Sequence, residues 1–246
     1  MKKNAFLLLL LSLGLSVFAQ TFEEANSLYA NKQYNEAYEA YTALENTWLN
    51  SATYWYNRGN SAYKIGMVSA SVWCYEKALK LDPSNDDILF NLELARNNVV
   101  DKITISPSYA FTSKVNRWMG LIPNALLTWG NLIFLILAVV FLLLFRKKRN
   151  LVKLRTFGYT MGILYISTLL LSLIKDEMAN NQNEAIVTHG RLSIQAEPNS
   201  DASALFILHE GTKVSWTETA SNNDWVEIEL SDGRQGWCEK KDLLFI

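Results

Sequence analysis

The chain contains two histidines, and one of them, His209, stands next to a carboxylate, Glu210. A histidine oriented by a carboxylate is a general base when a substrate cleft and a reacting group lie within reach. Zinc needs three or four ligands, and His189 and Cys238 are the other candidates near His209 in the sequence. No zinc-type spacing links these three residues. We therefore expect no catalytic and no metal site, and interpret His209 as the end of a strand before a turn at Gly211.

Alternating apolar residues on both sides of His209 predict short strands. The runs EAIVTH, RLSIQA, ALFILH, KVSWTE, WVEIEL and QGWCEK are separated by residues that favour turns, so residues 184–246 predict a small antiparallel barrel. Gly211 supplies the positive φ that the turn after His209 needs.

Three features of residues 184–246 carry a resemblance to a known family: a turn at Pro198, a glycine turn at Gly211 and the hairpin DGRQGW at 232–237. The segment resembles the bacterial SH3 (SH3b) family over its whole length. Gln195 stands where that family usually has an arginine, which puts an arginine-dependent ligand contact in doubt. The resemblance implies a ligand surface with exposed aromatic rings, and core packing is the alternative for each candidate. The candidates are Trp216, Trp225 and Trp237.

Three apolar blocks indicate export and membrane insertion. The first follows two lysines and ends in small residues, so residues 1–19 predict a signal peptide, with an uncleaved anchor as the alternative. Residues 125–145 and 157–174 lack charged residues and are long enough to cross a bilayer, with a buried hairpin of a soluble core as the alternative.

Charge predicts the topology of the two spans. The loop 146–156 between them has six basic and no acidic residues, which favours the cytoplasm, whereas residues 175–246 carry a net charge of 6 − 13 = −7. Residues 20–124 and 175–246 are then extracytoplasmic, at a bacterial inner membrane, with 175–183 as a linker. Positive charge gathered in a short loop argues against a nucleic-acid partner. Residues 99–124 are either a plain linker or a helix at the lipid surface, with Trp118 and Met119 toward lipid and Lys114 and Arg117 toward headgroups.

A repeat of 34 residues organises the exported N-terminal segment 20–98. Aligning Ala25 with Gly59 also aligns Asn26 with Asn60 and Tyr41 with Tyr75. This period is typical of the tetratricopeptide repeat (TPR), a pair of antiparallel helices. In the first copy Lys32 replaces the glycine at the turn, and a closing helix is expected at 85–98. The second copy matches the pattern at Trp55, Gly59, Gly66, Tyr75, Ala78 and Pro83, and departs from it at Arg58, Ala62 and Ser71.

Repeats of this kind bind a partner segment in a groove lined by the first helix of each pair. The amides and phenols at these positions suit an extended peptide, although Tyr29 and Tyr63 alternatively pack between helices. The predicted partner-binding residues are Asn26, Tyr29, Tyr56, Asn60, Tyr63 and Lys64. The two cysteines, Cys74 and Cys238, fall in different predicted domains, and we interpret both as small buried apolar residues, with a cross-domain disulfide as the alternative.

The order of segments (signal peptide, two repeats, two spans and an SH3b domain) resembles the BatE family of aerotolerance (Bat) operon proteins. NRGNSAYKIG followed by CYEKALKLDPSNDDILFNLELARNN, LFILHEGTKV and DGRQGW carry this resemblance. It implies a multidomain membrane scaffold linked to oxidative-stress tolerance or envelope integrity. Because the sequence shows no convergent site, we expect no cofactor and no enzymatic activity. The implied partners are Bat proteins with von Willebrand A domains and, indirectly, a MoxR-type ATPase. The alternative function is binding of cell-wall peptidoglycan through the SH3b domain.

Overall fold

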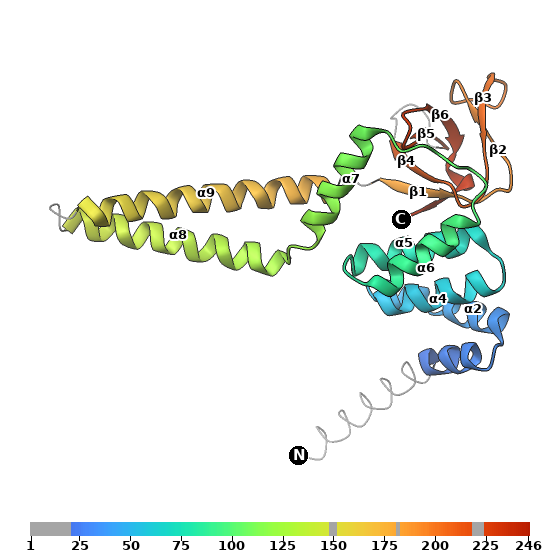
Figure 1. Ribbon diagram of the computed structural model, residues 1–246, viewed down its shortest axis with the longest axis horizontal. Coiled ribbons are helices and arrows are strands. Elements are labelled where there is room, and N and C mark those ends of the chain that lie inside the picture. The colour runs from blue at the N-terminus through green and yellow to red at the C-terminus, as the bar shows by residue number, and fades with distance from the viewer. Residues whose placement is uncertain (1–20, 148–151, 181–182, 218–223) are drawn as a thin grey trace, which may run out of the picture. The chain divides into compact units, whose positions relative to one another are not determined.

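A computed structural model describes residues 21–147, 152–180, 183–217 and 224–246, and the chain forms two compact units (Figure 1). The head unit contains the described residues up to Ser106 and from Asn183 onward, and the hairpin unit contains residues 107–180. The predicted signal peptide, 1–19, and the centre of the predicted basic loop, 148–151, lie outside the described residues.

The helices of the head unit begin and end where local sequence favours it. The side chain of Ser51 accepts a hydrogen bond from the backbone N–H of Tyr54, and the side chain of Asn85 accepts two in the same way, so both act as N-caps. Pro83 follows Asp82, the C-cap residue of a helix, at the position where the sequence predicts a helix end. The helices cover residues 21–30, α2 (Tyr34–Ala43), α3 (Glu45–Trp48), α4 (Ala52–Lys64), α5 (Val68–Leu81) and α6 (Asp86–Asn97).

The turns inside the two predicted repeats have the same backbone conformation. Gly66 has a φ of 78°, and Lys32, which stands 34 residues earlier, has a φ of 64°. A lysine in this region costs on the order of 1 kcal/mol relative to glycine. The first copy therefore keeps the turn geometry of the second even though it lacks the turn glycine.

The C-terminal segment is one antiparallel sheet with the strand order β3-β2-β6-β5-β4-β1-β7. Antiparallel pairing agrees with the prediction, but the predicted barrel is not closed, since β3 and β7 are the two edges of the sheet. The last strand was not predicted as a separate element. The strands are β1 (Glu184–Val187), β2 (Leu192–Gln195), β3 (Ala204–Leu208), β4 (Lys213–Thr217), β5 (Trp225–Glu229), β6 (Gln235–Glu239) and β7 (Leu243–Phe245), and a short 3₁₀ helix, η1 (Lys240–Asp242), precedes β7.

The edge strand β7 is covered by helices rather than by another strand. Trp73 Nε1 on α5 donates a hydrogen bond to the carbonyl of Phe245 at 2.8 Å. Leu244 and Ile246 pack against the helical core, and the fully buried Ile186 of β1 belongs to that core. An exposed edge is an aggregation hazard, so this docking replaces barrel closure as the way to protect the edge.

Helix α5 is buried on nearly all sides. Every residue from Ala70 to Glu76 is buried, whereas a helix on the surface of a protein alternates between buried and exposed faces. Helix α4 packs against α5 through Gly59, where an added Cβ would lie only 2.8 Å from ring carbons of Tyr75. The sheet covers the part of α5 that carries Trp73.

The hairpin unit contains α7 (Pro107–Gly120), α8 (Asn124–Lys147) and α9 (Val152–Asn180). The Asn131 amide of α8 donates to the Ser172 hydroxyl of α9, and nearer the turn the rings of Phe141 and Phe157 lie 4.4 Å apart, so the helices are antiparallel. Within α8 and α9, residues 124–144 and 156–177 are long and apolar enough to cross a membrane, and most of their residues are exposed.

Helix α7 occupies the segment in which a surface helix was one of the two alternatives. Trp118 is 78 % exposed and Phe111 is 70 % exposed. These two rings stand seven residues apart, so they lie on the same face of the helix. Contact of this face with lipid stays a prediction.

Candidate interaction surface

The predicted binding residue Asn60 is part of a hydrogen-bond set that joins three helices. The buried Tyr75 hydroxyl on α5 donates to Asn60 Oδ1 on α4 at 2.8 Å. Asn91 Nδ2 on α6 donates to the same oxygen at 3.1 Å and to the Tyr56 hydroxyl at 2.8 Å. Burial raises the pKa of the Tyr75 phenol, so this residue stays a neutral donor.

The same set occurs one repeat earlier in the chain. The Tyr41 hydroxyl donates to Asn26 Oδ1 at 2.5 Å, and Asn57 Nδ2 donates to that oxygen at 3.0 Å. Each residue stands 34 positions before its counterpart. These residues lie on a partly exposed side of helix 21–30, α4 and α6, which we call the A-helix face. It consists of Asn26, Tyr56, Asn57, Asn60 and Asn91.

The other three predicted groove residues lie at the border of this face. Tyr29 and Tyr63 are half-buried and pack against the helical core, in line with the packing alternative, and the Tyr29 ring also contacts Tyr34 at 5.2 Å. Lys64 is exposed at the last position of α4. These residues therefore flank the A-helix face and take no part in its hydrogen-bond sets.

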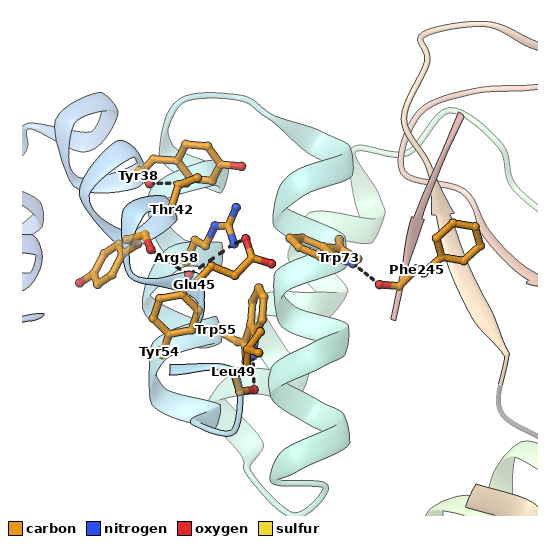
Figure 2. A network of polar contacts seen from close by, with 10 residues as sticks. Tyr38, Thr42, Glu45, Leu49, Tyr54, Trp55, Arg58, Trp73 and Phe245 are labelled. Carbon is orange, nitrogen blue, oxygen red and sulfur yellow. Dashed lines mark hydrogen bonds and ion pairs between the residues drawn. The ribbon is translucent and has the colours of Figure 1, made fainter. Parts of the chain in front are cut away.

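A buried arginine holds the two helix pairs together on the opposite side (Figure 2). Arg58, where the repeat usually has a leucine, donates to Glu45 at 2.8 Å. Its guanidinium lies 5.2–5.4 Å from the ring centroids of Tyr38, Trp55 and Trp73. Each such cation–π contact contributes about 0.5–2 kcal/mol, which offsets the cost of removing the arginine from water. Trp73 then continues the network to the carbonyl of Phe245.

Residues 52–85 match the model of the tetratricopeptide repeat family. The match covers α4 and α5, the better of the two predicted copies. A comparison with curated proteins gave no match. The first copy lies outside the matched residues, yet its turn has the same conformation as that of the matched repeat. Its Tyr–Asn–Asn set corresponds to that of Tyr75, Asn60 and Asn91, of which Asn91 also lies outside the match.

The histidine at the end of β3 contacts a residue 108 positions earlier. Asp101 lies in the extended segment 99–106 after α6, which we call the strap. Its carboxylate accepts from the His209 backbone N–H at 2.7 Å and from Thr212 Oγ1 at 2.6 Å, and it lies 2.8 Å from His209 Nδ1. The strap ends with the Ser106 N–H donating to the Ser231 carbonyl. His209 therefore attaches the strap to the sheet.

The turn after His209 also packs against the helices. Gly211 has a φ of 83°, as predicted, and an added Cβ would lie 2.8 Å from Val99 and 2.9 Å from Val68. Close packing is thus a second reason for glycine at this position.

An ion network joins the sheet to α5 beside this turn. Lys213 on β4 contacts Glu76 of α5 at 3.0 Å and Glu184 of β1 at 2.8 Å, and Arg96 of α6 also pairs with Glu76. Burial alone would raise the pKa of Glu76, but Lys213 and Arg96 outweigh it, so this pKa lies below its usual value. Glu76 therefore stays ionised although it is buried.

The three candidate tryptophans of the sheet have different surroundings. Trp216 packs edge-to-face against Phe245 at 4.9 Å and supports the core. Trp237 pairs in register with Gln195 and Glu227. Trp225 lines an open cleft of about 550 Å³. The other residues that line this cleft are Pro198, Asn199, Ser200, Asp224, Glu239, Lys240 and Lys241.

The other candidates for a metal or catalytic site, His189 and Cys238, have separate surroundings. His189 lies 3.5 Å from Asp242, while Cys238 is buried in the core of the sheet. No group of three or more His, Cys, Asp or Glu side chains in the described residues is arranged to hold a metal. Cys74 and Cys238 are both free and buried, and burial raises the pKa of each thiol to about 12.

Sequence reasoning missed three important residues. Asn57 and Asn91 had a usable signal, since they stand 34 positions apart like Asn26 and Asn60. Asp101 had none, because a single carboxylate in a linker does not reveal a partner more than a hundred residues away.

Replacing Asp101 with asparagine tests the strap. Burial raises the pKa of Asp101, but hydrogen bonds from Thr212 and His209 outweigh it and lower the pKa. The carboxylate thus contributes stability above its unfolded-state pKa of about 3.9, and this stability is lost as pH falls through the lower folded-state value. We expect Asp101→Asn to lower the free energy of unfolding at neutral pH by about 1–3 kcal/mol, and the difference from wild type to shrink below about pH 4.

The measurement is unfolding of the full chain by denaturant in detergent, with tryptophan fluorescence as the signal. Asp201→Asn, at an exposed turn, is the matched control and should leave stability unchanged. An Asp101→Asn difference that stays constant down to low pH would contradict the assignment.

Proposed function

We propose that the protein is a non-enzymatic, membrane-anchored scaffold that holds a partner protein segment on its A-helix face. The observation that carries this proposal is the repeated Tyr–Asn–Asn set. Buried tyrosines fix the amides of Asn26 and Asn60, while the side chains of both residues stay partly exposed. The TPR match supports protein–protein interaction in general.

Amides held in this way suit an extended peptide. The oxygen of each amide already accepts two internal hydrogen bonds, so its Nδ2 group is the part that can donate to the backbone carbonyls of a peptide of any sequence. Because the tyrosines already orient the two acceptor oxygens, little side-chain entropy is lost on binding. The hydrogen bonds and ion pairs described between helices and sheet start from α5 and the strap, on residues outside the A-helix face.

The two segments that form the head unit limit how the chain can be arranged across a membrane. It contains chain from before α7 and from after α9, so both parts lie on one side of any membrane that the α8–α9 hairpin crosses. The predicted signal peptide and the basic loop favour the extracytoplasmic side of the bacterial inner membrane for the head.

The resemblance to the BatE family supports a more specific role. We propose an envelope complex in which Bat proteins with von Willebrand A domains contact the TPR helices and a MoxR-type ATPase acts indirectly. Such a complex contributes to aerotolerance and oxidative-stress resistance. The SH3b-like sheet then supplies a second protein contact.

A second candidate function is binding of peptidoglycan by the sheet, which the cleft beside Trp225 favours. The indole offers an apolar wall, and the cleft carries two acidic and two basic residues, Asp224, Glu239, Lys240 and Lys241. This mixture suits a short peptide that bears charges of both signs, as the stem peptides of the cell wall do.

The scaffold proposal predicts that Asn26→Ala combined with Asn60→Ala reduces crosslinking of partner proteins in native membranes at least about fivefold, since two anchoring amides are lost. The control is Tyr41→Phe with Tyr75→Phe, which removes the hydrogen bonds from the tyrosines to Asn26 and Asn60 but keeps both amides, so it should lose less crosslinking. Crosslinking is quantified by mass spectrometry. Equal losses in both double variants would show a folding effect and reject the A-helix face.

The topology predicts that a cysteine replacing Asn150, in the basic loop, reacts with an impermeant maleimide only after the inner membrane is permeabilised. A cysteine replacing Ser84, in the head, should react in intact spheroplasts. The native thiols give little background, because they are buried and largely protonated at neutral pH. Labelling of the Asn150 variant in intact spheroplasts would overturn this arrangement.

The cleft predicts that the full chain in detergent is retained on purified peptidoglycan and that Trp225→Ala lowers retention at least about fivefold. Trp118→Ala removes an equally large ring from α7, and this variant should be retained on peptidoglycan as well as the wild type. Unchanged retention after Trp225→Ala, or none by the wild type, would exclude this second function.

A further inference from the structure

Helix α6 ends the helical array but has an apolar outer side. Its residues Phe90, Asn91 and Leu94 stand 34 positions after Tyr56, Asn57 and Asn60, so α6 is the first helix of an incomplete third repeat. Terminal helices of repeat proteins usually expose a polar face. Phe90, by contrast, is 62 % exposed and Leu94 is 36 % exposed.

Acidic residues surround these two apolar side chains. At 100° per residue, Asp86, Asp87 and Glu93 all fall within about 60° of Phe90 around the helix axis. All three are exposed. We call these five residues the α6 face: Asp86, Asp87, Phe90, Glu93 and Leu94.

The two basic residues next to the α6 face in the sequence both have partners. Arg96 pairs with Glu76 of α5, and Lys102 donates to the carbonyl of Asn97 at the C-terminal end of the helix. The α6 face is therefore apolar at its centre and negative at its rim. It continues the A-helix face, because Asn91 on the adjacent side of α6 contacts Tyr56 and Asn60.

Three possible occupants fit this pattern poorly. The chain that follows α6 is bound along the sheet by Asp101 and Ser106, so it does not turn back over Phe90. A second copy would bring two acidic rims together, which like-charge repulsion disfavours. Anionic lipid is disfavoured for the same reason.

We propose that the α6 face binds a partner protein segment in which a large apolar side chain stands next to lysine or arginine. The apolar side chain contacts Phe90 and Leu94, and the basic residues face Asp86, Asp87 and Glu93. The A-helix face holds the backbone of the same segment. This inference rests on the proposed scaffold function and adds the sequence preference that backbone contacts alone do not give.

The test uses the full chain in detergent and fluorescence anisotropy with three synthetic peptides of equal length. One carries a central phenylalanine between lysines, the second replaces the lysines by glutamates, and the third replaces the phenylalanine by alanine. We expect the wild type to bind the first at least about tenfold more tightly than either of the others, since the anchor residue and the charges both contribute.

Two variants probe the residues themselves. Phe90→Ala with Leu94→Ala should lower the affinity for the first peptide about tenfold. Leu49→Ala, at another exposed leucine, should leave this affinity unchanged. Asp87→Lys with Glu93→Lys should reverse the preference, so that the glutamate peptide binds more tightly. Leu94 is partly buried and Asp87 lies in the first turn of α6, where a cation opposes the helix dipole, so both double variants should lose some stability. Thermal unfolding of each variant checks that it is still folded at the temperature of the binding assay.

Each contrary result has a defined meaning. Equal binding of the lysine and glutamate peptides, no binding of any peptide by the wild type, or no effect of the Phe90 and Leu94 changes would overturn the inference. Self-association that these changes abolish would replace it with a homodimer. If crosslinking in native membranes depends on Asn26 and Asn60 but not on Phe90, the scaffold function is supported and the preference for an apolar residue beside basic ones is rejected.

Discussion

The architecture of the head unit depends on the burial of α5. Two helix pairs and one closing helix are a short array, and such arrays usually need about three units to bury a continuous core. Helix α5 has consecutive buried residues around its whole circumference, including Trp73 and Glu76, so one neighbouring helix cannot cover it. The sheet supplies the missing cover through the Phe245 carbonyl, Lys213 and the glycine turn at Gly211. The sheet takes the place of a further repeat.

Because the sheet covers α5, internal packing and the proposed partner binding use different sides of the helices. The side of the helices that carries Arg58, its aromatic rings and α5 is used for internal packing (Figure 2). The opposite side carries asparagine amides that are fixed from behind by buried tyrosines and remain accessible in front. The protein can thus present an ordered polar surface without a large solenoid behind it. The strap contributes to the same rigidity, because Asp101 links the end of the helical array to the sheet.

Regular spacing decided which features could be predicted from the sequence. The 34-residue period gave the helix pairs and the positions of Asn26 and Asn60, uncharged runs gave the two apolar helices, and Gly211 gave a turn with positive φ. The open form of the sheet, the strand β7 and the contact of Asp101 with His209 could not be predicted. Asp101 and His209 are 108 positions apart, and β7 pairs with β1 rather than with a strand next to it in the sequence, so no local pattern encodes these contacts. Arg58 was noted as a departure from the repeat pattern, but the aromatic rings around it come from three helices.

The hydrogen bond from Trp73 to Phe245 also constrains when the protein can fold. The two residues are 172 positions apart, and the acceptor lies in the last strand of the chain. During synthesis, α5 emerges early but keeps an uncovered apolar side until the C-terminal residues have been made. If α8 and α9 cross the membrane, that wait includes insertion of both helices and export of the sheet. Burial of α5 would then depend on the sheet reaching the same side of the membrane as the helices, because a chain whose sheet is missing or wrongly placed leaves α5 exposed to proteases.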